Sequence, residues 1–372
     1  MLREISVSVN VLRNGAVRGV LHALGDTEPI IRAEDSADIK TTLRGSFEVT
    51  ARDRTWRYVE FNPLMDELQP ILSINGYSSS LGRFYPAVVE PITLNNDYLD
   101  LEAYDRCWRV QTTTGLSRVF FRAGTEYLTA IKQLLTACGI INIRATANTA
   151  VLTEDREDWD FGTDYLTIIN QLLSEINYKP LWFDSTGAAV LEPKRTPTAA
   201  NIQHTLDSSR PITLLRPGIR RKKDIFETPN VYIAVCDNPE KSEIMTATAV
   251  NNNPVSPLSV QKRGREIVSV VHVDNIASQA ELQAYADRLI FDSMTTGETI
   301  QVESSLQLGW GVGDVVAFHY KADRAMIYLP DGTAITRGPE EINSICISKA
   351  WEMQLKPGGA MSHTLEKVVT LG

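Results

Sequence analysis

GTEYLTAIKQLL at residues 124–135 and GTDYLTIINQLL at residues 162–173 are two copies of one segment, identical at nine of twelve positions. Each copy places leucine and isoleucine three or four residues apart, which is the spacing of one face of an α-helix. Thr125 is a candidate N-cap for the first helix, and Gly139 is a candidate C-terminal stop. The pair predicts one helical unit used twice, although chance similarity between two amphipathic helices is an alternative. The apolar positions expected to be buried are Leu134, Leu135, Leu172 and Leu173.

The residues before this pair are predicted to be mostly strand. Apolar and polar residues alternate from Ile5 to Val11, which is the pattern of a half-buried strand. Asn14 and Gly15 follow, and both tolerate the positive φ of a tight hairpin turn. Residues 46–50 and 98–103 have further strand patterns.

Strand patterns return after the second copy. Residues 180–191 predict a hairpin with its turn at 184–187, and residues 193–212 are rich in Pro, Thr, Ala and Ser, as in a connector. One helix is predicted over 278–293, because Ser278 and Glu281 have the spacing of a capping box. The remaining β-branched runs predict strands at 231–236, 267–273, 299–308, 314–319 and 345–355.

This order of segments predicts an α+β chain. We expect a first β domain over residues 1–115 and an α/β insert with the two repeated helices over 116–212. A second β domain with one inserted helix is expected over 213–372. The length of 372 residues fits two or three domains of about 150 residues each.

The charge of the chain limits the classes of partner. The formal net charge is −9, which disfavours general binding to nucleic acid, because such binding needs cations that displace counterions from phosphate. No run of eighteen apolar residues and no signal-peptide pattern occurs, which predicts a protein made and kept in a cytoplasm until assembly. The four cysteines form no CxxC pair and are expected to be reduced thiols: Cys107, Cys138, Cys236 and Cys346.

The residues that could carry chemistry form no recognisable site. The acidic run from Glu154 to Asp160 could bind a cation, but it lacks the Gly and the terminal Glu of a calcium loop, so a solvated loop is expected. The basic run Arg220–Lys223 is expected to contact a protein rather than phosphate. A glycosidase with two distant carboxylates stays open, because its two acids need not be close in sequence. We therefore predict no catalytic, cofactor-binding or metal-binding residues. Two further sets are scattered: the histidines His22, His204, His272, His319 and His363, and the tryptophans Trp56, Trp108, Trp159, Trp182, Trp310 and Trp351, which are expected to pack in a core or interface.

The order of several short segments resembles hub-type minor tail proteins of phages and prophages, the siphophage relatives of the contractile-tail baseplate hub. The matching segments are LDLEAYDR (99–106), the Gly-Thr helix from Gly124, WDFGT (159–163), YKPLWFD (178–184), TPNVY (228–232), NPVSP (253–257) and WEMQLKPGGAMSHT (351–364). They lie along nearly the whole chain, and their joint order is more specific than any one of them.

This resemblance implies a homotrimer in the tail tip of a virion. Each subunit would give two tube-like β-barrel domains, and six barrels would continue the six-fold tail tube. The implied partners are the distal tail protein, the tape measure protein and a central fibre or spike protein, and DNA would pass through the channel. Some relatives carry a lysozyme, peptidase or fibre region after the hub, whereas this sequence stops at Gly372, so wall digestion is expected on another protein. A wall-degrading enzyme and a carbohydrate-binding tip module are the alternatives.

Overall fold

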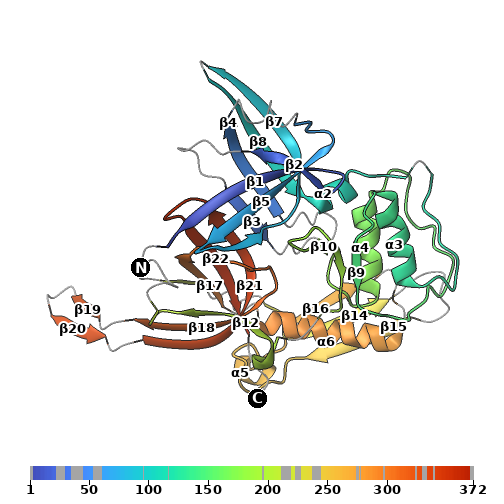
Figure 1. Ribbon diagram of the computed structural model, residues 1–372. Coiled ribbons are helices and arrows are strands. Elements are labelled where there is room, and N and C mark those ends of the chain that lie inside the picture. Colours follow the sequence, from blue (N-terminus) through green and yellow to red (C-terminus); the bar gives the residue numbers. More distant parts are fainter. Residues whose placement is uncertain are drawn as a thin grey trace.

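The computed structural model describes residues 3–21, 30–34, 45–52, 61–94, 96–115, 117–194, 197–210, 219–222, 228–236, 244–273, 276, 278–295, 298–322, 325–328, 333–337 and 340–368. Strands predominate and helices are few, as expected for an α+β chain (Figure 1). Within these ranges, no helix has the length and apolar character needed to cross a membrane.

A single large sheet runs through both β-rich parts of the chain. Its path is β13-β17-β22-β21-β3-β4-β8-β7-β5-β1-β2, with β6 beside β5 and with β12 and β18 branching from β21. Strands from the two ends of the sequence meet where β21 pairs with β3. The strands are β1 (Ile5–Arg13), β2 (Ala16–Leu21), β3 (Ile30–Glu34), β4 (Gly45–Arg52), β5 (Asp66–Ile74), β6 (Tyr77–Ser80), β7 (Phe84–Leu94), β8 (Asn96–Asp105), β12 (Ile202–Asp207), β13 (Arg220–Lys222), β17 (Thr299–Ser305), β18 (Val315–Ala322), β21 (Glu340–Gln354) and β22 (Ala360–Lys367).

The sheet has one shared core and two ends. Phe47 and Leu72 from the first part of the chain lie in the same apolar cluster as Phe318 and Leu365 from the last part. Along the described strands the path begins at β13 and ends at β2 without closing, so two separate closed barrels are not seen in the single chain. Each terminal strand therefore has one edge that no described strand covers.

The predicted hairpin at the start of the chain is confirmed. Strands β1 and β2 pair antiparallel and meet at Arg13 and Ala16. Between them Asn14 has φ 52° and Gly15 has φ 79°, which are the two positive values that this turn needs.

The region between β8 and β12 forms a separate α/β unit. Its helices are α2 (Arg106–Gln111), α3 (Tyr127–Ala137) and α4 (Tyr165–Glu175), followed by the short 3-10 helix η1 (Ala199–Asn201). Its strands β9 (Ile143–Ala145), β10 (Trp182–Phe183) and β11 (Ala189–Leu191) form a small sheet in the order β10-β11-β9. Strands β10 and β11 are the predicted hairpin, whose turn closes through a 2.8 Å hydrogen bond from Gly187 N to Asp184 O.

The repeated segments adopt the same structure. Helices α3 and α4 each have eleven residues, and Gly124 (φ 81°) and Gly162 (φ 85°) stand at equivalent positions before them. After α3, Gly139 has φ 78°, and after α4 the equivalent Asn177 has φ 56°. These positive values make the same C-terminal turn, so the repeat extends beyond the twelve residues that match in sequence.

The N-cap prediction for the first helix was wrong by one residue. Glu126 and not Thr125 is the N-cap of α3, and its side chain makes no capping hydrogen bond. The Thr125 carbonyl instead accepts a 2.8 Å hydrogen bond from Leu152 N. In α4 the equivalent Asp164 accepts from Thr167 N at 2.8 Å, because its carboxylate is near enough to the first turn.

The segment that precedes each repeated helix pairs with a segment of the other repeat. Glu126, before α3, bridges to Val151 of the second repeat, and Asp164, before α4, bridges to Thr114 of the first. Phe121 and Trp159 hold equivalent positions, and their rings meet edge to face with centroids 6.2 Å apart. Each repeat therefore completes the other, and together they enclose one core.

The four leucines of the repeat are buried as predicted. We expect Leu172→Ala to lower the free energy of unfolding by about 3 kcal/mol, because the removed atoms leave a cavity in a closed core. Chemical denaturation measures the loss, with Gln133→Ala on the exposed face of α3 as the control. A loss below about 1 kcal/mol for the leucine variant would contradict this packing.

A second small unit lies between β13 and β17. Strands β14 (Val231–Cys236), β15 (Met245–Val250) and β16 (Val268–His272) form a sheet in the order β15-β14-β16, with helix α6 (Gln279–Thr295) beside it and the short α5 (Val260–Arg263) in a connection. The predicted capping of α6 is confirmed, because Ser278 Oγ accepts from Glu281 N at 3.2 Å. The sequence did not indicate that the strands around 231–236 and 267–273 form a sheet of their own.

The predicted connector over 193–212 was partly wrong. Residues Ile202–Asp207 form β12, which pairs parallel with β18 of the large sheet. A hairpin of β19 (Ala325–Tyr328) and β20 (Ala334–Arg337) extends from the end of β18 (Figure 1). The domain boundaries near residues 115 and 212 stay predictions.

Candidate functional site

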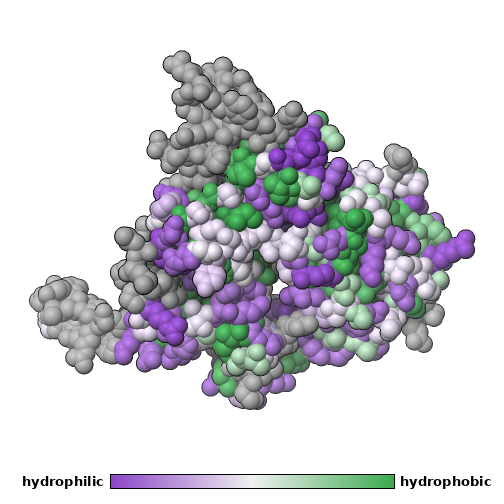
Figure 2. All heavy atoms as spheres, viewed as in Figure 1, coloured by the Kyte–Doolittle hydropathy of each residue, from purple (hydrophilic) through white to green (hydrophobic). Residues whose placement is uncertain are grey.

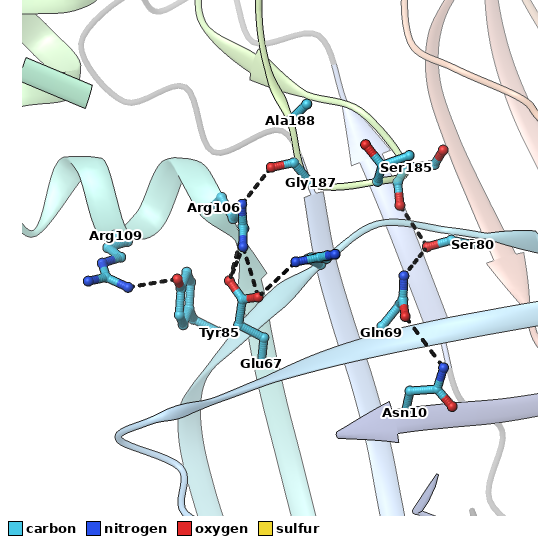
Figure 3. Close-up of polar contacts among 12 residues, drawn as sticks. Asn10, Glu67, Gln69, Ser80, Tyr85, Arg106, Arg109, Ser185, Gly187 and Ala188 are labelled. Atoms are coloured by element: carbon cyan, nitrogen blue, oxygen red, sulfur yellow. Dashed lines mark hydrogen bonds and ion pairs between the residues drawn. The ribbon is translucent and has the colours of Figure 1, made fainter. Parts of the chain in front are cut away.

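The α/β unit is joined to the large sheet through a polar junction (Figure 3). At its centre, the buried carboxylate of Glu67 on β5 accepts two hydrogen bonds of 2.9 Å from the guanidinium of Arg106 on α2. Arg83 lies 3.7 Å from the same carboxylate. Hydrogen bonds from a planar guanidinium to a carboxylate are directional, so this charged contact fixes how α2 lies relative to β5.

The same arginine reaches the turn of the β10–β11 hairpin. Arg106 Nη1 donates a 2.6 Å hydrogen bond to the Gly187 carbonyl, and Ser80 Oγ on β6 donates a 2.7 Å bond to the Ser185 carbonyl (Figure 3). Gly187 has φ 80°, and an added Cβ there would lie 2.6 Å from the Arg83 side chain. The close approach therefore depends on glycine at this position.

Polar side chains continue the junction into the sheet. Asn10 on β1 donates to Gln69 on β5 at 3.4 Å, and Gln69 donates to Ser80 at 3.1 Å. On the α2 side, Arg109 donates a 2.8 Å hydrogen bond to the Tyr85 hydroxyl. Burial and the nearby Glu67 carboxylate raise the pKa of Tyr85, so this phenol stays neutral and can accept the bond. These polar contacts fix the orientation of the α/β unit relative to the large sheet.

We expect Gly187→Ala to loosen this junction. The alanine would carry the strain of a positive φ and the clash with Arg83, so the free energy of unfolding should fall by about 2 kcal/mol. Gly124→Ala is a matched control, because Gly124 has nearly the same φ and no atom within 4 Å of an added Cβ, so it should cost about 1 kcal/mol. Hydrogen exchange should rise at residues 184–188 in the first variant only, and equal exchange in both variants would contradict the role of the junction.

The acidic run predicted as a solvated loop contains a buried ion cluster. Arg156 is 3% exposed and donates to Glu175 at 2.7 Å and to Asp158 at 2.7 Å. Tyr127 Oη donates a 2.9 Å bond to the same Glu175 carboxylate. Burial raises the pKa of Glu175 more than its hydrogen bonds from Arg156 lower it. The interpretation as a solvated loop is therefore wrong for Arg156, while Asp155 accepts a 2.7 Å bond from Ala123 N at the surface.

A serine and a histidine meet inside the large sheet, but the pair is closed to solvent. Ser304 Oγ on β17 and His363 Nε2 on β22 are 2.7 Å apart, and both side chains are buried. Among the described residues, buried His363 Nδ1 has no hydrogen-bond partner, so none of their carboxylates orients the ring as hydrolases require. Burial, and after it the nearby His204, lower the pKa of His363 to about 3, so the ring is neutral at pH 7.

An aromatic stack connects this histidine to the surface of the sheet. The Trp310 ring lies between His363 and His204, with centroids 4.3 Å from each. His204 Nε2 is 2.9 Å from Asp314 Oδ2, and Trp310 Nε1 donates to Ser348 Oγ at 2.9 Å. These contacts join strands of the large sheet and support the prediction that tryptophans pack in a core.

The other predicted candidates lie far apart. His272 is on β16 and His319 on β18, whereas His22, Trp56 and Lys223 lie outside the described residues. Trp159 and Trp351 are buried, and Trp108 and Trp182 are half-buried. All four cysteines are buried and form no disulfide, as expected for reduced thiols. Among the described residues, no three His, Cys, Asp or Glu side chains are grouped to hold a metal ion.

The basic run lies at one end of the large sheet. Residues Arg220–Lys222 form the terminal strand β13, and all three are exposed. Arg221 pairs with Glu298, which places one of these charges against the neighbouring connection. At the other end, Figure 2 shows hydrophilic residues in the part of the view where Figure 1 labels β2. The two ends differ in character, because β13 consists of three basic residues, whereas β2 (AVRGVL) has Arg18 as its one charged side chain. On each of these strands one edge is left uncovered by the other described strands.

Sequence reasoning missed the residues of the junction. Glu67 and Arg83 belong to no motif, and Arg106 was noted only as the last residue of the segment LDLEAYDR, without a role. Their separation along the chain gives no spacing signal. The predicted turn at 184–187 was the one available indication, and it did not show what the turn would contact.

Comparisons with known proteins were made at the levels of sequence and structure. No model of a known protein family matches the chain, and no curated protein matches it in sequence. A tail protein from Neisseria meningitidis MC58 is similar in structure, with a TM-score of 0.63 and 13% identity over 97% of this chain and 96% of that one. The 43 kDa tail protein of prophage MuSo2 from Shewanella oneidensis has a TM-score of 0.61 and 10% identity over 97% of this chain and 98% of its own. Prophage tail protein gp18 from Listeria monocytogenes EGD-e has a TM-score of 0.55 and 13% identity over 96% and 94%.

Proposed function

Because the chain has the fold of phage and prophage tail proteins along nearly its whole length, we propose that it is the structural hub of a phage tail tip. The observation that carries this proposal is the extent of the structural match. Nearly all of this chain, with its large sheet and both smaller units, aligns with nearly all of each tail protein. The hub would join the distal tail ring and tail tube to a central fibre or spike, and it would form part of the channel for DNA ejection.

The uncovered edges of the sheet suggest how copies would assemble. A ring needs a heterologous interface that closes, in which one surface of each copy meets a different surface of the next. Strands β13 and β2 are two different edges of one sheet, so they can supply such an interface. In our proposal three copies form the ring, and the two tube-like barrels expected for each chain are completed by strands of neighbouring copies.

Electron microscopy of tails that contain this chain tests the proposal. We expect three copies in a three-fold ring at the distal end of the tube. A six-fold ring, a single copy, or a position away from the tip would overturn the hub assignment.

The charge of the chain suggests which face meets DNA. With a net charge of −9, a neutral or negative lumen would let DNA pass without strong binding, because few phosphates would be neutralised. The exposed strand Arg220–Lys222 would then face a protein partner, such as the distal tail protein or the tape measure protein. In the same reconstruction, a lumen ringed by Arg220 and Arg221 would contradict this orientation.

We propose that the chain itself is not an enzyme. The Ser304–His363 pair is buried and is oriented by no acid in the described part of the chain, and the junction around Glu67 holds two units together. Purified full-length protein should release no soluble fragments from bacterial cell walls. Release that persists in Ser304→Ala would point to a carboxylate-based wall hydrolase instead.

A further inference from the structure

Strand β16 is the least covered strand of the second small unit. Val268 is 50% exposed and Val270 is 53% exposed, although both belong to a paired strand. Helix α6 packs against β15 and β14, and its contacts with β16 are at most marginal. The run IVSVVHV at residues 267–273 contains five β-branched apolar residues. Because side chains alternate along a strand, Val268 and Val270 lie on the open face, whereas Val273 packs against the core beneath α6.

The hydrogen bonds of β16 show that its outer edge can receive another strand. Among the described strands, β16 pairs with β14 alone, and the pairing is parallel. The Ile267 carbonyl accepts from Val231 N at 3.2 Å, and Val273 N donates to the Val235 carbonyl at 2.9 Å. Because backbone groups alternate along a strand, those of Val268 and Val270 point away from β14. An extended polypeptide is the ligand that matches such an edge.

The sequence of β16 is complementary to itself in the antiparallel direction. With Ser269 opposite Ser269 of a second copy, Val268 lies opposite Val270 and Glu266 lies opposite His272. Val268, Val270 and His272 have even numbers, so their side chains share one face and their backbone groups point to the same edge, and Glu266 would continue this alternation just before the strand. Two copies would thus form a cluster of four valines, with a Glu266–His272 pair on each side of it.

The position of α6 leaves room for this pairing. Strands in a sheet are about 4.8 Å apart, so two helices that each lie over β15 and β14 would be roughly 19 Å apart across the joined sheet. Because a helix with its side chains is about 10–12 Å wide, the two helices would not collide.

We propose that β16 pairs antiparallel with β16 of a second copy, which joins two three-stranded sheets into one across a two-fold axis. A nucleic acid or a charged surface fits this edge poorly, because the run from Ile267 to Val273 carries no permanent charge. The contact goes beyond the hub function, since it involves neither β2 nor β13.

Sedimentation velocity of the purified full-length chain over a range of concentrations tests the pairing. We expect species that contain an even number of chains. Val270→Lys should weaken the association at least about tenfold, because it places a charge within the valine cluster. Val255→Lys is the matched control, since Val255 is exposed in a loop of the same unit and should leave the association unchanged.

A charge exchange tests the register. Glu266→Lys should weaken the association about fivefold, and combining it with His272→Glu should restore it. Both residues are exposed, so these variants should fold even if Val270→Lys does not. Monomers at every concentration, or equal association of the wild type and the Glu266→Lys variant, would overturn the proposal. A failure of the three-fold ring in tails would leave this result unchanged.

Discussion

Arg156→Met is expected to lower the free energy of unfolding by about 3–5 kcal/mol. The arginine is 3% exposed and Glu175 is 2% exposed, so the methionine would leave a buried carboxylate without its cation. Hydrogen bonds from Arg156 to Glu175 and to Asp158 would be lost together. Chemical denaturation at neutral pH measures the loss.

The internal repeat supplies the control for this substitution. Arg118 is the equivalent residue in the first repeat, but it is 45% exposed and pairs with an exposed aspartate, Asp160, at 3.5 Å. Arg118→Met should therefore cost less than about 1 kcal/mol. Adding Glu175→Leu to Arg156→Met should recover much of the loss, because the unpaired buried charge is then removed. Equal losses for the two arginine variants would contradict the importance of burial.

Acid is expected to destabilise the protein through His363. Burial lowers the pKa of this ring to about 3, whereas an unfolded histidine has a pKa of about 6.5. Between these values the unfolded chain binds a proton that the folded chain does not, so stability is lost as the pH falls below about 6.5. The loss from this residue should reach about 3 kcal/mol at pH 4 and about 4 kcal/mol at pH 3.

His363→Gln isolates this contribution, because glutamine can hydrogen-bond to Ser304 but does not titrate. The difference in unfolding free energy between wild type and variant should shrink by about 3 kcal/mol from pH 7 to pH 4. All other titrating groups are common to both proteins and cancel in the difference. A pH-independent difference for His363→Gln would contradict this prediction, because it would show that the ring binds a proton as readily in the folded protein as in the unfolded chain.

Local signals in the sequence predicted the elements well. Asn14 and Gly15 identified the first hairpin because few residues accept two positive φ values in succession. The repeat identified both helices and their buried faces, since periodicity and burial follow from the same geometry. Gly139 marked one helix end, whereas the equivalent Asn177 was not recognised, because asparagine adopts this conformation less often.

Contacts between distant residues could not be predicted in the same way. The pairing of β21 with β3 joins the two β-rich parts into one sheet, yet each strand has an ordinary pattern by itself. Arg156 stood in a run of acids and was interpreted as a surface charge, although Glu175 lies on the buried face of α4. Glu67 and Arg106 likewise depend on the placement of α2 beside β5. Sequence periodicity reports which side of an element is buried, but it does not report the partner.

The segments that precede the two repeated helices, each paired with the other repeat, also bear on how the chain is made. When α3 has left the ribosome, the residues that bridge to its start, around Val151, are not yet available. Equivalent positions of the repeats are 38 residues apart, because Gly162 follows Gly124 by that interval. At roughly 5–20 residues per second, synthesis of this interval takes about 2–8 s. During that time the apolar face of the nascent first repeat lacks its natural cover, which makes it a point where a chaperone would act.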